Sequence, residues 1–77
     1  MDMHFDRELD ARGLLCPLPI LKTRFAMDAM ASGEVLKVLS TDGGSVRDME
    51  AFARQTRNEL LASLADAGEY VFFLLKG

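Results

Sequence analysis

Residues 9–19 read LDARGLLCPLP, and within this segment the pattern changes from that of a strand to that of a helix. Upstream of it, Phe5–Asp10 alternates loosely between apolar and polar residues, which predicts a short first strand followed by a loop at Gly13. Pro17 suits the first position of a helix, because its missing N–H would have no partner there. Pro19 still lies within the first turn, so both prolines are compatible with a helix that starts directly after Cys16.

The residues after Pro17 predict an amphipathic helix. Apolar side chains recur at spacings of three and four residues, which is typical of a helix with one apolar face. We expect this face to pack on the core; it comprises Leu18, Leu21, Phe25 and Ala29. The pair Ser32-Gly33 predicts the end of the helix, because glycine readily adopts the left-handed conformation of a C-terminal cap.

Three further strands and a second helix are predicted downstream. Val35–Ser40 is short and rich in β-forming residues, and the strands Leu60–Leu64 and Tyr70–Leu75 flank a turn that contains Gly68. Between them lies a second helical stripe, which comprises Val46, Met49, Phe52, Ala53 and Thr56 and ends near Asn58. Ser45 and Asp48 form an approximate capping box at the start of that helix.

The predicted order of elements is β-α-β-α-β-β, which favours an α/β (α+β) two-layer sandwich. Its four-stranded mixed sheet carries both helices on one face. The 77 residues make one domain, 1–77, and we expect residues 1–4 to form a frayed N-terminus. The last strand, Tyr70–Leu75, is apolar on both faces, so it is either a central strand or part of an interface with a partner.

Composition excludes several classes of function. A single cysteine excludes an intrachain disulfide, and one cysteine with one histidine excludes a closed zinc site. The net charge of −3 disfavours direct nucleic-acid binding, and neither a membrane span nor a secretory signal is recognisable. No cofactor-binding motif or metal site is predicted, and the lone thiol is typical of the reducing cytoplasm.

Cys16 is the candidate reactive residue. At the start of a helix its thiol lies at the positive end of the helix dipole, so we expect its pKa to be lowered. Pro17 and Pro19 have no N–H, which leaves the amide of Leu18 as the main hydrogen-bond donor to a sulfur anion.

The surroundings of Cys16 in the sequence favour a carrier over an enzyme. A dithiol oxidoreductase needs a second cysteine to resolve the disulfide, and the chain has none. Hydrolysis through an acyl-enzyme needs a general base, and the one histidine, His4, lies in the expected frayed terminus. An exposed thiol can still attack a sulfur atom on another protein and carry it away as a persulfide. The alternatives are an inert buried cysteine, a redox-sensing switch, or a thiol-independent module that docks through its apolar sheet face.

The segment from Leu9 to Pro19 resembles the signature of the TusA-like (SirA-like) sulfur carrier family, whose hallmark is Cys-Pro-x-Pro at a helix start. The resemblance extends over about residues 5–76 and includes Ser32-Gly33-Glu34 and Val46-Arg47-Asp48-Met49. It implies a cytoplasmic sulfur carrier that holds sulfane sulfur on Cys16. It also implies a relay in which a cysteine desulfurase or rhodanese-like donor loads the carrier. A DsrE-like or other acceptor then directs the sulfur to tRNA 2-thiolation or to sulfur and thiosulfate metabolism.

The same resemblance assigns supporting residues. Pro17 and Pro19 are framework residues, and Asp10 and Gly13 shape the loop beside the thiol. Independently of the resemblance, the position of Lys22 and Arg24 one to two turns beyond Cys16 makes them candidates for partner docking or for stabilising a sulfur anion; the alternative is a solvated face of the helix. One departure is Asp42-Gly43, where family members often have Asp-Pro. We expect no direct contact with nucleic acid or membrane, and a monomer or weak homo-oligomer.

Overall fold

The computed structural model describes residues 3–77. Its elements follow the predicted order β-α-β-α-β-β. They are β1 (Arg7–Ala11), α1 (Leu18–Asp28), β2 (Val35–Ser40), α2 (Ser45–Gln55), β3 (Glu59–Asp66) and β4 (Glu69–Leu75). The prediction of a frayed terminus concerns residues 1–4, of which Met1 and Asp2 lie outside the described residues, while the His4 side chain contacts the Asp6 carboxylate at 3.0 Å.

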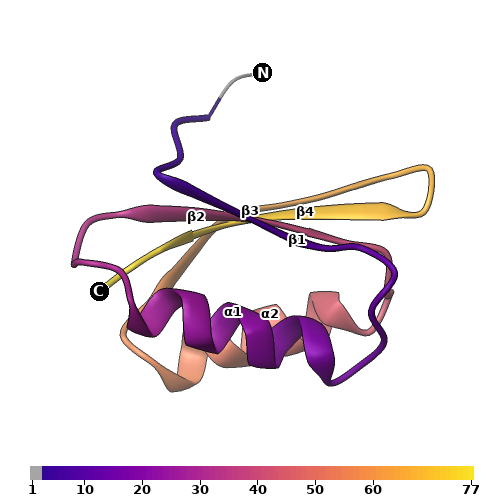
Figure 1. The fold of residues 1–77 in the computed structure, drawn as a ribbon, viewed down its shortest axis with the longest axis horizontal. Coiled ribbons are helices and arrows are strands. Elements are labelled where there is room, and N and C mark those ends of the chain that lie inside the picture. Colours follow the sequence, from indigo (N-terminus) through magenta and orange to yellow (C-terminus); the bar gives the residue numbers. More distant parts are fainter. Residues whose placement is uncertain (1–2) are drawn as a thin grey trace.

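The four strands form one mixed sheet in the order β1-β2-β4-β3. β1 runs parallel to β2, with Ala11 opposite Ser40 at their ends, and the other two pairings are antiparallel. Both helices cover one face of the sheet, while residues 3–6 leave the sheet on the opposite side (Figure 1). The predicted two-layer fold class is therefore confirmed.

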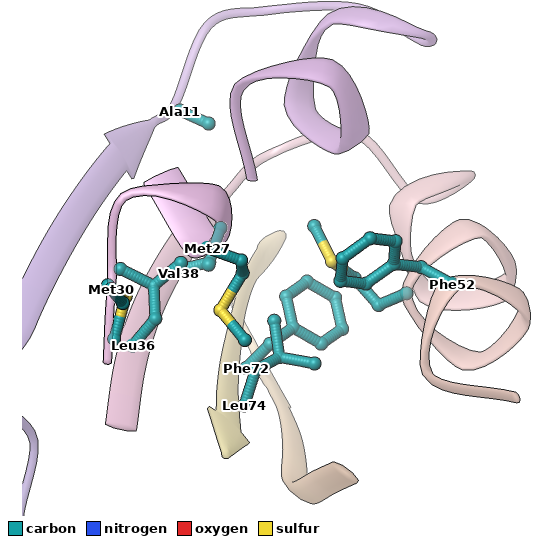
Figure 2. Close-up of a cluster of buried hydrophobic side chains, with 9 residues drawn as sticks. Ala11, Met27, Met30, Leu36, Val38, Phe52, Phe72 and Leu74 are labelled. Atoms are coloured by element: carbon teal, nitrogen blue, oxygen red, sulfur yellow. The ribbon is translucent and has the colours of Figure 1, made fainter. Parts of the chain in front are cut away.

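The core lies between the sheet and the two helices. Phe72 and Leu74 of β4 point into it and are fully buried, together with Leu36 and Val38 of β2. Figure 2 shows that Met27 of α1 and Phe52 of α2 pack against these side chains from the helical layer. Alternation along β2 and β4 places every second side chain on this face, because successive residues of a strand point to opposite sides.

The predicted core-facing stripe of α1 is wrong. Its three large members point to solvent: Leu18 is 45% exposed, Leu21 42% and Phe25 75%. The buried face carries Pro19, Thr23 and Met27 instead. Both sets have helical spacing, so periodicity alone could not decide between them. Thr23 is tolerated inside because its hydroxyl donates to the Pro19 carbonyl oxygen at 2.8 Å.

The ends of α1 also differ from the prediction. Pro17 is the N-terminal cap, so the helix begins one residue later than expected, and Pro19 occupies the first turn. The helix ends at Asp28, before the predicted stop at Ser32-Gly33. Gly33 does have a positive φ of 90°, but it lies in the turn that leads into β2.

β4 is an interior strand, which explains why it is apolar on both faces. Phe73 lies on the face away from the helices and is only 6% exposed, because Phe5 covers it with a ring-centroid separation of 6.4 Å. The ammonium of Lys37 in turn lies 5.1 Å from the centre of the Phe5 ring. Of the two interpretations of this strand, the central strand with covered side chains is the one that the structure supports.

The two edges of the sheet are β1 and β3. β1 is short, and it begins two residues later than the predicted Phe5–Asp10. β3 is joined to β4 by the turn Ala67-Gly68, in which both residues have positive φ, as expected for a tight hairpin. A register shift between Leu60 and Ala62 interrupts the pairing of β3 with a bulge. In the part of the chain from residue 3 onward, no helix has the length and apolarity that crossing a membrane requires.

We predict that Phe72→Ala lowers the free energy of unfolding by about 3–5 kcal/mol, because it leaves a cavity beneath both helices. Leu64→Ala is the control, because that side chain lies on β3 and is 54% exposed; we expect a change within about 0.5 kcal/mol. Urea denaturation followed by circular dichroism measures both. Equal destabilisation by the two substitutions would contradict the placement of the core.

Candidate functional site

The site forms where the loops after β1 and β2 meet. These neighbouring strands are parallel, so their C-terminal ends, Ala11 and Ser40, lie side by side. The first loop carries Cys16, and the second leads into α2 (Figure 1). The geometry of parallel strands thus brings a thiol and the start of a second helix together across 26 residues or more of sequence. Cys16 is exposed.

Asp42 ties the two loops together. Its Oδ2 atom accepts a hydrogen bond from the backbone N–H of Cys16 at 2.7 Å, and its Oδ1 atom accepts one from the N–H of Gly44 at 3.2 Å. Its backbone carbonyl accepts a hydrogen bond from the Ser45 hydroxyl. Hydrogen bonds to a carboxylate are stronger than neutral ones, so Asp42 fixes the position of the reactive residue.

Asp48 lies beside the sulfur. The Cys16 thiol donates to its Oδ2 atom at an Sγ–O distance of 3.3 Å. The predicted capping box of Ser45 and Asp48 does not form: the cap of α2 is Gly44, with no side-chain hydrogen bond. Asp48 occupies the first turn of α2, as predicted for an acidic residue near a helix start, but its partner is a thiol on the other loop.

The prediction that the start of the helix lowers the pKa of the Cys16 thiol is wrong. The hydrogen bond to Asp48 raises the pKa of Cys16 above its ordinary value, and partial desolvation and the negative charges of Asp48 and Asp42 add to this. The negative charges of these two carboxylates disfavour the thiolate, which is the opposite of the effect expected from the helix dipole. The Leu18 amide is not a donor to sulfur either, because its N–H donates to the Leu15 carbonyl oxygen at 2.9 Å.

Hydrogen bonds made by Gly13 and Asp10 shape the loop before Cys16. Gly13 has a φ of 82°, and its N–H donates to the Thr41 hydroxyl at 2.8 Å, which joins this loop to the end of β2. Asp10 accepts hydrogen bonds from the backbone N–H and the guanidinium of Arg12. The contact with Arg12 lowers the pKa of Asp10 to about 2. Asp10, near the end of β1, and Gly13, in the loop that follows, therefore both lie close to the segment that presents the thiol.

Gly43 leaves space for a neighbouring side chain. A Cβ atom at this position would lie 3.3 Å from the hydroxyl oxygen of Tyr70 on β4, which is tighter than an ordinary contact. The Asp42-Gly43 pair, which departs from the Asp-Pro of the family pattern, thus coincides with a tyrosine packed against the turn.

The two candidate docking residues differ in their surroundings. The guanidinium carbon of Arg24 lies 5.2 Å from the centre of the Phe52 ring, across a groove between α1 and α2 that Asp48 also lines. Lys22 is an exposed residue of α1. Neither lies on the first turn with Cys16.

Sequence reasoning missed Asp42 and Asp48 as part of the site. No local spacing connects them with Cys16, although Asp42 stands at the position of the family's Asp-Pro pattern. A further signal is topological: residues after two adjacent parallel strands meet at one end of the sheet. Among residues 3–77, no group of three or more His, Cys, Asp and Glu side chains is arranged to hold a metal ion.

The comparisons with known proteins identify the family of this chain. The profile of the family described as "Sulfurtransferase TusA" matches residues 7–76, including the whole site. The chain belongs to this family. A relative from Allochromatium vinosum named "Sulfur carrier protein TusA" is 54% identical over 72 residues, covering 94% of this chain and 95% of that one. A second protein of that name, from Pseudomonas entomophila, is 37% identical over 75 residues and covers 97% and 94% of the two chains.

A solved structure supports the architecture. The crystal structure of a SirA-like protein from Desulfitobacterium hafniense superposes with a TM-score of 0.80. It covers 94% of this chain and 99% of that one at 23% sequence identity, so it bears on the fold alone.

We predict that Asp48→Asn lowers the pKa of the Cys16 thiol relative to the unsubstituted protein, because the substitution removes the negative charge that disfavours the thiolate. The thiolate is the reactive form, so alkylation by iodoacetamide at neutral pH should become severalfold faster, and its pH profile should move to lower pH.

The matched control is Glu50→Gln, which removes the same charge from an exposed position of α2. We expect it to leave the pH profile of alkylation in place. Superimposable profiles for the unsubstituted protein and Asp48→Asn would show that Asp48 does not hold the thiol proton.

Proposed function

We propose that this chain is a sulfur carrier that accepts sulfane sulfur as a persulfide on Cys16 and passes it to a partner protein. The observation that carries the proposal is the exposed residue Cys16, whose backbone N–H donates to the Asp42 carboxylate at the junction of two loops. Membership of the TusA family and the names of the relatives support it. The chain contains no second cysteine, so a sulfur atom bound here can leave only to another molecule.

The chemistry is a thiol–persulfide exchange. The sulfur of Cys16 loses its proton and attacks the outer sulfur of the donor persulfide, forming a new S–S bond as the donor's S–S bond breaks. The donor's inner sulfur leaves as a thiolate and takes up a proton, so the step needs no oxidant. Handing the sulfur on repeats the reaction with an acceptor thiol.

The acidic surroundings of Cys16 make this a reaction that depends on the partner. Asp48 and Asp42 raise the pKa of the thiol, so the free carrier holds its proton at neutral pH. A proton acceptor on the partner then completes the reactive pair. We therefore assign a role as carrier rather than as stand-alone enzyme.

In this proposal the supporting residues hold Cys16 in an accessible position. Pro17 and Pro19 set the start of α1, and Leu18 opens its first turn. Asp10 and Gly13 hold the preceding loop through Arg12 and Thr41.

The proposed partners follow from the family. The donor is a cysteine desulfurase or a rhodanese-like protein, and the acceptor is a DsrE-like or similar protein that serves tRNA 2-thiolation or sulfur and thiosulfate metabolism. Lys22 and Arg24 contribute positive charge to docking. The proposed compartment is the cytoplasm, where a lone thiol stays reduced, and the proposed state is a monomer or weak homo-oligomer.

Two alternatives are weaker on specific observations. A redox-sensing switch needs an acidic thiol, whereas the pKa of Cys16 is raised. A thiol-independent module docking through the open face of the sheet needs an exposed apolar β4, whereas Phe73 is 6% exposed beneath Phe5.

We predict that the protein gains the mass of one sulfur atom when it is incubated with a cysteine desulfurase and cysteine, and loses it on reduction. Intact-protein mass spectrometry measures the change. Cys16→Ser should gain nothing, because no other thiol is present in the chain. The same gain in Cys16→Ser, or no gain in the unsubstituted protein with desulfurase, rhodanese-like or small persulfide donors, would refute the proposed function.

A further inference from the structure

A groove between α1 and α2 lies beside the reactive cysteine. Its volume is about 160 Å³. We call it the α1–α2 groove; it is lined by Ile20, Arg24, Asp48, Ala51, Phe52 and Gln55. Asp48 joins the groove to the reactive site, because the same carboxylate accepts the hydrogen bond of the Cys16 thiol at 3.3 Å. A molecule bound next to Asp48 in this groove is therefore also close to the sulfur atom.

The α1–α2 groove holds one positive and one negative side chain. The guanidinium carbon of Arg24 lies 5.2 Å from the centre of the Phe52 ring, and a guanidinium in this position keeps N–H groups that can bind a carboxylate. Asp48 accepts the thiol through Oδ2, and a carboxylate has further acceptor capacity for a second donor such as an ammonium. Among residues 3–77, neither Arg24 nor Asp48 forms an ion pair with another side chain.

A ligand that matches both charges is a small zwitterion. An α-amino acid has its carboxylate and its ammonium on one carbon atom, so it can meet a cation and an anion within one groove. The volume of the groove is below the roughly 300–1,000 Å³ of sites for drug-sized ligands, which favours a molecule with few atoms. The apolar side chains of Ile20, Ala51 and Phe52 offer contacts to the remainder of such a ligand.

The neighbouring thiol indicates the side chain of this amino acid. In the proposed function Cys16 takes one sulfur atom from a persulfide, and cysteine persulfide is the amino acid that carries such a sulfur. Its ammonium and the Cys16 thiol have the same neighbour, Asp48, so binding of the ammonium brings the ligand's persulfide to the reactive atom. Holding two reacting groups together in this way accelerates their reaction.

An ammonium at Asp48 also changes the reactivity of the thiol. In the free chain the hydrogen bond to Asp48 raises the pKa of Cys16. A cation beside Asp48 offsets the negative charge and competes with the thiol for the carboxylate, so it favours the thiolate. The ligand thus promotes deprotonation of the residue with which it reacts.

We propose that the α1–α2 groove binds a zwitterionic amino-acid persulfide, with its carboxylate on Arg24 and its ammonium on Asp48, and that this small molecule loads Cys16 without a protein donor. The inference rests on the proposed function and adds a second source of sulfur to it. The Cys16 thiolate attacks the outer sulfur of the ligand and forms a new S–S bond while the ligand's S–S bond breaks. The inner sulfur leaves as a thiolate and takes up the proton that Cys16 lost, so the products are the loaded carrier and free cysteine.

The test compares cysteine persulfide with two analogues that each lack one charge. The persulfide of cysteamine has no carboxylate, and the persulfide of mercaptopropionic acid has no ammonium. The rate at which the reduced protein gains one sulfur atom is measured by intact-protein mass spectrometry after rapid quenching. Each donor is compared with itself across the protein variants, so differences in the intrinsic reactivity of the donors cancel.

We expect Arg24→Gln to slow loading by cysteine persulfide about tenfold, because the charged hydrogen bond to the ligand's carboxylate is lost. Loading by cysteamine persulfide should stay within about twofold of the unsubstituted rate, because that donor has no carboxylate to bind. Asp48→Asn should lower the ratio of the rates with cysteine persulfide and mercaptopropionic acid persulfide about tenfold, because only the first donor has an ammonium.

The matched control is Arg54→Gln, which removes the same charge from an exposed residue of α2 that does not line the groove. It should load at the unsubstituted rate from all three donors. Thermal unfolding of each variant checks that the fold is intact.

Two results would overturn the inference. Arg24→Gln could load from cysteine persulfide at the unsubstituted rate, or it could slow loading by cysteine persulfide and cysteamine persulfide equally. Failure of the proposed function is recognised separately. The unsubstituted protein would then gain no sulfur from any persulfide or from a desulfurase, or Cys16→Ser would gain it as the unsubstituted protein does.

Discussion

The parallel pairing of β1 with β2 is the constraint on which the site depends. If these strands were antiparallel, their C-terminal ends would lie at opposite ends of the sheet, and the loops that follow them could not meet. With parallel strands, Cys16 and the two carboxylates converge although they are far apart in the sequence. The hydrogen bond from the Cys16 N–H to Asp42 then joins the first loop to the second.

At this junction, the accessibility of Cys16 and the reactivity of its thiol depend on different features. Exposure makes the sulfur accessible, while Asp48 and Asp42 keep it protonated in the free chain. An exposed thiolate would react with any oxidant or electrophile that it met, whereas an exposed thiol is comparatively inert. The structure thus combines open access with low intrinsic reactivity, a combination that suits a protein whose reaction should occur only in a complex.

The order of the elements and the position of Cys16 before a helix could be anticipated from the sequence, whereas the interior location of Tyr70–Leu75 was one of two interpretations that the sequence left open. The orientation of α1 could not be anticipated. Its two faces, one with Leu18, Leu21 and Phe25 and the other with Pro19, Thr23 and Met27, both have helical spacing, and greater hydrophobicity favoured the wrong one. The environment of the thiol could not be predicted either, because Asp42 and Asp48 are far from Cys16 in the sequence and the pairing of β1 with β2 brings them close to it.

The bulge in β3 has a consequence for whether this edge of the sheet can pair with another chain. An edge strand with regular, unpaired backbone groups is a template onto which another chain can add. A protein that also has solvent-exposed leucines and a solvent-exposed phenylalanine is at particular risk of aggregation. The irregularity between Leu60 and Ala62, with Glu59 and Asp66 at the two ends of the strand, disturbs that template. Straightening this edge should therefore promote fibrous aggregates even though the site itself is untouched.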